Sequence, residues 1–334
     1  MIGPLLLMLA ATAAAQPGCT QVRTALPQAG VCVEGAGGVA LAATEAEART
    51  LLAQAGTGER RFRAAFGREP ARYAVFSFED PAAGRTTAEA LRGLGFTVVL
   101  PLPSDALRER QMAEAMARLQ LGAPPGAAPG RVVRRDGASG SGEPRGPNFV
   151  PHELGHQWYV AAFWSGAAPQ PAGTRRYGSP APDWLDEAAA MLMEDAAGDQ
   201  GYRQRFADGR SEDAQRAALV PPEIPLAELL RMEHPALAGL PAPGAAPGAV
   251  NVLATSRPSL FYAEARVFTD YLVEKSGDPR ILAVVSDGLR GGDTFAAWLA
   301  AHGREHRLAT SFEAMQADWS GWLDRRYGAA PSGA

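Results

Sequence analysis

The spacing of apolar residues in the first third of the chain changes repeatedly between helical and strand periods. From Thr44 to Phe66 apolar residues recur every three or four positions, interrupted near Gly56 and Gly58, and Gly67 is placed to end the helix. Between residues 72 and 78 the pattern alternates, which is typical of a strand. The pattern predicts, in order, a helix over 44–66, a strand over 72–78, a helix over 88–94, a strand over 96–100 and a helix over 105–121.

The pattern changes after residue 121. Gly, Pro and Ala dominate residues 122–147, with one short candidate edge strand at 131–134, and the chain after Asn148 has mainly helical spacing. We expect loops at 165–182 and 234–258, and C-terminal helices over 259–275, 293–301 and 310–327. The sequence thus predicts an α+β protein with a mixed α/β N-terminal lobe over 16–147 and a mainly helical lobe over 148–334, both parts of one domain.

The first residues have the pattern of an export signal. Leu5 to Ala11 form a short apolar core, and Ala13 to Ala15 fit a small-residue cleavage site, so residues 1–15 are predicted to be a cleaved signal peptide. A membrane anchor is the alternative, but about 14 apolar or small residues fall short of the roughly 20 that span a bilayer. A lipid anchor on Cys19 would need an aliphatic residue three positions earlier. We expect a secreted or periplasmic protein with no stable membrane span.

Charge and cysteine content narrow the function classes. The net charge is −4, and Lys275 is the single lysine among 32 basic residues. The arginines are scattered and form no stripe that could follow phosphates, so nucleic acid is not an expected partner. In an oxidising compartment the only two cysteines, Cys19 and Cys32, are expected to form a structural disulfide rather than a catalytic or metal site.

The candidate metal-binding motif is the segment His152-Glu153-Leu154-Gly155-His156. Histidines four residues apart project from one face of a helix, so both imidazoles can bind a single Zn²⁺ at about 2.0–2.1 Å. Glu153 lies beside that face, where it can act on a metal-bound water instead of the metal. The alternative is a pair of core histidines, but such a pair needs hydrogen-bond partners of its own.

A catalytic zinc site needs a third protein ligand. A histidine six residues after His156 would supply it in metzincins, but Ala162 stands there. The segment 184–194, Trp-Leu-Asp-Glu-Ala-Ala-Ala-Met-Leu-Met-Glu, instead offers Glu187 as a ligand. The alternative for Glu187 is an acidic residue in the first turn of a helix, where a negative charge suits the macrodipole.

These two segments together resemble the gluzincin zinc metallopeptidases, a peptidase MA-like group that includes the aminopeptidase N and thermolysin types. The resemblance covers residues 148–195 and implies a zincin-like catalytic domain with a sheet over the HExxH helix. Within it Glu187 takes the ligand position, and Glu194 matches a second glutamate two turns further along the same helix face. Asp186 replaces the usual asparagine. The segment that captures a substrate's free amine is absent at 138–146, so aminopeptidase specificity is not implied.

The resemblance implies hydrolysis of peptide bonds in extracytoplasmic peptides or proteins by a metal-activated water, with Glu153 as general base. Tyr262 is the candidate donor to the oxyanion, with simple packing as its alternative. His234 and the inverted motif His302–His306 are expected to be loop residues. The alternative function is a catalytically silent, zinc-bound scaffold protein with the same fold, but the presence of Glu153 favours the enzyme.

Overall fold

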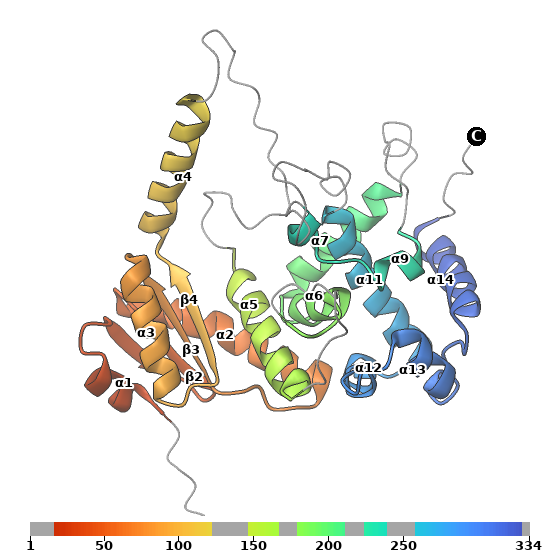
Figure 1. Cartoon of the computed structure of the whole chain (residues 1–334), viewed down its shortest axis with the longest axis horizontal. Helices are drawn as coiled ribbons and strands as arrows, with labels where there is room; N and C mark the ends of the chain where they lie inside the picture. The colour runs from red at the N-terminus through yellow and green to blue at the C-terminus, as the bar shows by residue number, and fades with distance from the viewer. Residues whose placement is uncertain (1–16, 122–145, 167–178, 211–223, 239–257, 329–334) are drawn as a thin grey trace, which may run out of the picture.

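The structure is a computed structural model, and it describes residues 17–121, 146–166, 179–210, 224–238 and 258–328. These residues form a small sheet and many helices, which confirms the α+β class (Figure 1). The predicted signal peptide (1–15) and the candidate strand at 131–134 lie outside the described residues. Among the helices searched within these ranges, none is both long and apolar enough to cross a bilayer.

The sheet has four strands in the order β1-β2-β3-β4. The strands are β1 (Val31–Glu34), β2 (Gly38–Ala42), β3 (Tyr73–Phe78) and β4 (Val98–Pro103). β1 is antiparallel to β2, and β2, β3 and β4 are parallel, with Val75 of β3 opposite both Ala40 and Leu100. The sequence pattern predicts β3 and β4 but not the first two strands. β2 is buried along its whole length and therefore shows no polar alternation.

Helices cover both faces of the sheet. α1 (Cys19–Ala25) and α3 (Pro81–Gly93) pack on one face, and α2 (Glu45–Phe66) packs on the other. Successive residues of β2 alternate between these faces, with Val39 and Leu41 facing α1 and α3, and Ala40 facing α2. The predicted disulfide between Cys19 and Cys32 is confirmed and joins α1 to β1.

Two helices differ from the sequence prediction, α2 in its continuity and α3 in its start. α2 begins and ends as predicted, at the Thr44 cap and at Gly67 with φ of 65°, but it continues unbroken through its two glycines. At Gly58 a Cβ atom would lie 3.0 Å from the ring of Trp158, so this glycine admits a neighbouring helix. α3 begins seven residues earlier than predicted. The Asp80 carboxylate accepts hydrogen bonds from the first helical N–H groups there, so the expected turn is a helix cap.

The candidate metal-binding segments lie on α5 (Phe149–Tyr159) and α6 (Asp183–Met191), between the sheet and the C-terminal helices (Figure 1). A short π-helix, η1 (Val160–Trp164), continues α5. The two helices cross closely at Gly155, where a Cβ atom would lie 2.9 Å from Cα of Ala190 and 2.7 Å from Cγ of Met193. A glycine between the two histidines therefore sets the distance between the helices.

α5 is fixed to the sheet at two points. The Trp158 ring packs edge-on against Tyr73 of β3, with 5.5 Å between centroids, and its Nε1–H donates to the carbonyl of Ala71. The Gln157 side chain accepts a hydrogen bond from the Val99 N–H of β4, at 3.2 Å. The HExxH helix thus packs beside α2 and along the outer edge of the sheet.

The rest of the described chain is mainly helical. Helix α4 (Asp105–Leu121) matches its predicted range. The other helices are α7 (Ala196–Gly209), α9 (Leu226–Leu229), α10 (Pro235–Ala238), α11 (Pro258–Ser276), α12 (Ile281–Leu289), α13 (Phe295–His302) and α14 (Phe312–Tyr327). The three predicted C-terminal helices correspond to α11, α13 and α14 within two residues. α11 packs against α6 and α7. One hydrophobic core extends from β2 to α14 and so includes residues of both predicted lobes.

Candidate metal centre

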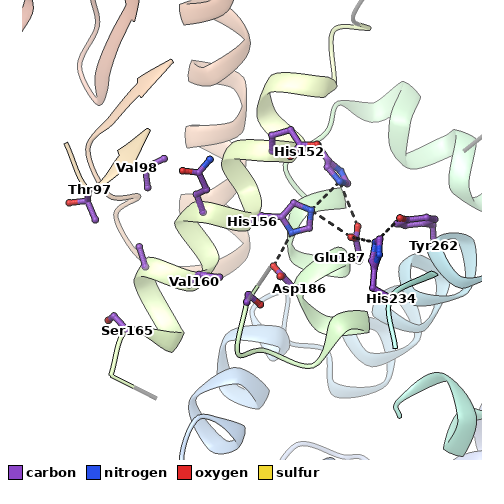
Figure 2. A pocket seen from close by; sticks show the side chains of 14 residues that line it. Thr97, Val98, His152, His156, Val160, Ser165, Asp186, Glu187, His234 and Tyr262 are labelled. Atoms are coloured by element: carbon purple, nitrogen blue, oxygen red, sulfur yellow. Dashed lines mark hydrogen bonds and ion pairs between the residues drawn. The ribbon is translucent and has the colours of Figure 1, made fainter. Parts of the chain in front are cut away.

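His152 and His156 project from the same face of α5, one turn apart (Figure 2). Their Nε2 atoms are 3.3 Å apart. Two ligands of one tetrahedral zinc, each at about 2.0–2.1 Å, lie about 3.3–3.4 Å from one another. The spacing of the two imidazole nitrogens therefore suits a shared zinc ion.

Glu187 enters the same site from the first turns of α6. Its Oε2 lies 3.6 Å from Nε2 of His152, and its Oε1 lies 3.7 Å from Nε2 of His156. The residue is only 3% exposed, and Oε2 is buried with no hydrogen-bond partner in the part of the chain described. A buried carboxylate oxygen without a partner is costly, and a cation held by the two imidazoles would satisfy it.

Each candidate histidine ligand is oriented by a carboxylate on the far side of its ring. Nδ1–H of His152 donates to Oε1 of Glu194 at 2.8 Å, and Nδ1–H of His156 donates to Oδ1 of Asp186 at 2.9 Å. Such contacts fix the proton on Nδ1 and leave Nε2 as the metal-binding atom. Asp186 and Glu194 therefore orient the ligands.

The expected position of Glu194 on the same helix face as Glu187 is wrong. α6 ends at Met191, and Glu194 lies in the turn that follows. That turn brings the Glu194 carboxylate back towards α5, where it also accepts a hydrogen bond from the hydroxyl of Tyr202 at 2.7 Å. The seven-residue spacing from Glu187 to Glu194 predicts one continuous helix, but α6 ends before Glu194.

His234 belongs to the site, although the sequence predicts only a loop residue at this position. It lies in the irregular segment before α10, but it is buried, with 4% exposure. Its Nε2 lies 2.9 Å from Oε1 of Glu187 and 2.7 Å from the Tyr262 hydroxyl (Figure 2). Its backbone N–H donates to the Asp183 carboxylate at the start of α6. The scarcity of histidine, five in the chain, was the only sequence signal.

The charges in the site act in opposite directions on the two kinds of ligand. Burial raises the pKa of Glu187, but the hydrogen bond from His234 and the nearby imidazoles outweigh it and hold that pKa below its usual range. Burial lowers the pKa of His156, but Asp186, Glu187 and Glu153 outweigh it and raise that pKa to about 9. Without metal, His156 thus keeps a second proton, on the Nε2 that faces His152.

The site opens into a cavity of about 560 Å³. Glu153 and Tyr262, the two residues predicted to act in catalysis, line this cavity together with the candidate ligands. The lining also includes Thr97 just before β4 and Val98 at its start, Val160 and Ala161 of η1, and Ser165 and Ser179. All five predicted site residues, His152, Glu153, His156, Glu187 and Tyr262, therefore meet at one cavity.

The inverted motif His302–His306 is placed elsewhere. His302 ends α13 with its side chain 49% exposed, and His306 stacks on the Trp298 ring in the turn that follows. Within the described ranges, the cluster of His152, His156 and Glu187 is the group whose donor atoms all lie within 4.8 Å of one another. The structure does not gather the second motif into such a group.

Two imidazoles and a carboxylate form a donor set that suits Zn²⁺, and the partnerless Oε2 of Glu187 supports this fit. Comparison of the chain with protein-family models, with curated proteins and with solved structures finds no match. The geometry of these residues is therefore the basis on which a function can be assigned.

Proposed function

We propose that this protein is a zinc-dependent peptidase that hydrolyses peptide bonds in extracytoplasmic peptides or proteins. One observation carries the proposal: Nε2 of His152, Nε2 of His156 and the partnerless Oε2 of Glu187 converge at a cavity whose wall also contains Glu153. A set of three protein ligands leaves a coordination position open, as in catalytic rather than structural zinc sites.

His152, His156 and Glu187 would hold the metal. When bound, zinc supplies Lewis acidity, which polarises a substrate carbonyl and lowers the pKa of a coordinated water. The protein's part is to hold a proton on Nδ1 of each ring and to aim Nε2 at the metal, which is the effect of the hydrogen bonds to Glu194 and Asp186.

Glu153 follows His152 directly on α5, so its carboxylate lines the cavity without joining the ligand set. In this position a carboxylate acts as a general base that takes a proton from the attacking water. The same carboxyl then gives the proton to the nitrogen of the leaving amine. A ligand site alone would not need this residue.

Tyr262 is proposed to stabilise the negative charge that develops on the substrate carbonyl oxygen. Its hydroxyl lies on the cavity wall, 2.7 Å from Nε2 of His234. Since Glu187 is a carboxylate, Nε2 of His234 must be the donor in the contact between these two residues. Because a protonated Nε2 cannot accept, the Tyr262 hydroxyl does not donate its hydrogen to His234.

An extracytoplasmic location remains part of the proposal. The disulfide between Cys19 and Cys32 supports it, because such bonds persist in oxidising compartments. Fractionation of the native host with an antibody to the chain, together with the mass of its mature N-terminus, tests location and signal cleavage directly.

The test of the activity compares zinc-loaded wild type with Glu153→Gln in the digestion of a broad peptide library. Glu89→Gln, which changes an exposed glutamate on α3, is the matched control. We expect both variants to bind zinc and only Glu153→Gln to lose cleavage. If the wild type binds zinc but cleaves nothing that Glu153→Gln spares, the protein is a zinc-bound scaffold and the peptidase proposal fails.

A further inference from the structure

The two oxygens of Glu187 have different surroundings. Oε1 lies 2.9 Å from Nε2 of His234, whereas Oε2 is buried with no hydrogen-bond partner in the described chain and lies 3.6 Å from Nε2 of His152. A carboxylate can bind a metal through one oxygen or through both, and a hydrogen bond to one oxygen favours binding through the other. The asymmetry indicates which oxygen is available to a metal.

His234 itself is held in place from three directions. Its backbone N–H donates to Oδ2 of Asp183 at 2.6 Å, its ring packs edge-on against Phe261 with 6.1 Å between centroids, and Nε2 lies 2.7 Å from the Tyr262 hydroxyl. Because Asp183 and Glu187 both lie on α6, the same helix positions the donor and the acceptor. The imidazole therefore meets the carboxylate in a fixed geometry.

We propose that His234 is a positioning residue that makes Glu187 a one-oxygen ligand, holding Oε1 through Nε2–H so that Oε2 alone faces the metal. This inference rests on the proposed zinc site but not on peptidase activity. A site with two histidines and one carboxylate oxygen keeps low coordination, which leaves room for substrate and water. Without the His234 hydrogen bond, Oε1 is released and both oxygens can bind.

The experiment measures metal affinity and coordination in the full-length chain, with zinc and with Co²⁺ as a spectroscopic substitute. The test variant is His234→Phe, which keeps an aromatic ring against Phe261 but has no N–H. His234→Gln is the rescue variant, because its amide NH₂ can reach the place of Nε2. His302→Phe, at an exposed histidine remote from the site, is the matched control.

We expect His234→Phe to weaken zinc binding about 10- to 100-fold, as loss of an outer hydrogen bond to a ligand does. We also expect its Co²⁺ visible bands to lose intensity, since five-coordinate Co²⁺ absorbs more weakly than tetrahedral Co²⁺. His234→Gln should retain most of the affinity and the intense bands, and His302→Phe should match the wild type.

Three results would overturn the inference. The first is wild-type zinc affinity and an unchanged Co²⁺ spectrum in His234→Phe. The second is equal loss in His234→Phe and His234→Gln, which would assign the effect to packing. The third is a wild type that binds neither metal. By contrast, a zinc-loaded wild type that cleaves no peptide refutes the peptidase and leaves the assignment of His234 intact. Should His234→Phe fail to fold, the spectrum and affinity of His234→Gln decide, because a role for Nε2–H requires them to remain near those of the wild type.

Discussion

Replacement of Gly155 by alanine tests the close crossing of α5 and α6 that brings the candidate ligands together. The new Cβ would lie 2.9 Å from Cα of Ala190 and 2.7 Å from Cγ of Met193. Met193 is a flexible side chain, but Ala190 presents backbone. The helices would have to separate by about 0.5 Å to restore an ordinary contact of 3.4 Å with Ala190.

The expected loss of stability follows from two opposing effects. Overpacking of a buried contact costs about 1–3 kcal/mol, and the steric contact here is with backbone, which cannot rotate away. Alanine in place of glycine within a helix returns about 1 kcal/mol. We therefore expect Gly155→Ala to lower the free energy of unfolding by about 0–2 kcal/mol, instead of raising it. Because the shift moves Glu187 away from the two histidines, zinc affinity should fall at least about tenfold.

The matched control is Gly56→Ala on α2, where the nearest outside atom to a new Cβ is Nη1 of Arg60 at 3.8 Å. That variant should gain about 0.5–1 kcal/mol. Urea unfolding in the presence of a chelator gives the stability of each metal-free protein, and competition with a zinc indicator gives the affinity. Equal stabilisation by the two substitutions would refute the argument that Gly155 sets the helix separation.

Three further outcomes are expected. Removal of either outer carboxylate, by Asp186→Ala or Glu194→Ala, should weaken zinc binding about 10- to 100-fold in indicator competition; unchanged affinity would show that these contacts do not orient the ligands. The pKa of His156 in the folded, metal-free protein, about 9, lies above its unfolded value of about 6.5, so the folded state binds this proton more tightly. The resulting stabilisation of the metal-free protein is complete below pH about 6.5 and is lost as the pH rises through about 9, whereas zinc affinity rises over that interval. Urea unfolding and zinc titrations at several pH values in this range measure the two trends. Zinc affinity that does not change with pH would contradict the raised pKa of His156. Finally, the double variant Cys19→Ser, Cys32→Ser opens a short loop and should lose about 3 kcal/mol in urea unfolding; a loss well below 1 kcal/mol would mean that the loop is held closed by other contacts.

Local signals were sufficient to predict the elements that have clear caps and a clear period. α2 has both a Thr44 cap and a terminal glycine, and its range was predicted within one residue. β2 could not be predicted, because a strand buried on both faces has no alternation of apolar and polar residues. Its five small and aliphatic residues fit neither the helical period nor the alternating strand period. The start of α3 was missed because Asp80-Pro81 suits a turn and a helix N-terminus equally well.

The residues of the site also differ in whether a local sequence pattern predicts them. His152 and His156 are neighbours through a local helical period, so their meeting could be predicted from spacing alone. Glu187 required a resemblance, because it lies 31 residues after His156, beyond the reach of a local helical period. His234 reaches Glu187 only through the packing of a segment 47 residues further along the chain. No local pattern encodes such a contact, and neither periodicity nor motif spacing reports on it.

The hydrogen bond between Gln157 and Val99 has a consequence for assembly. Val98 and Ser104 direct their N–H groups at β3, so Val99 and the prolines at 101 and 103 occupy the positions of β4 that face outwards. Proline has no N–H, and the Val99 N–H is already bound to Gln157. A strand from a second molecule would therefore meet an edge with no donor to offer along β4. Natural sheets resist edge-to-edge aggregation in this way, and here one of the protecting side chains comes from the helix that bears the histidines.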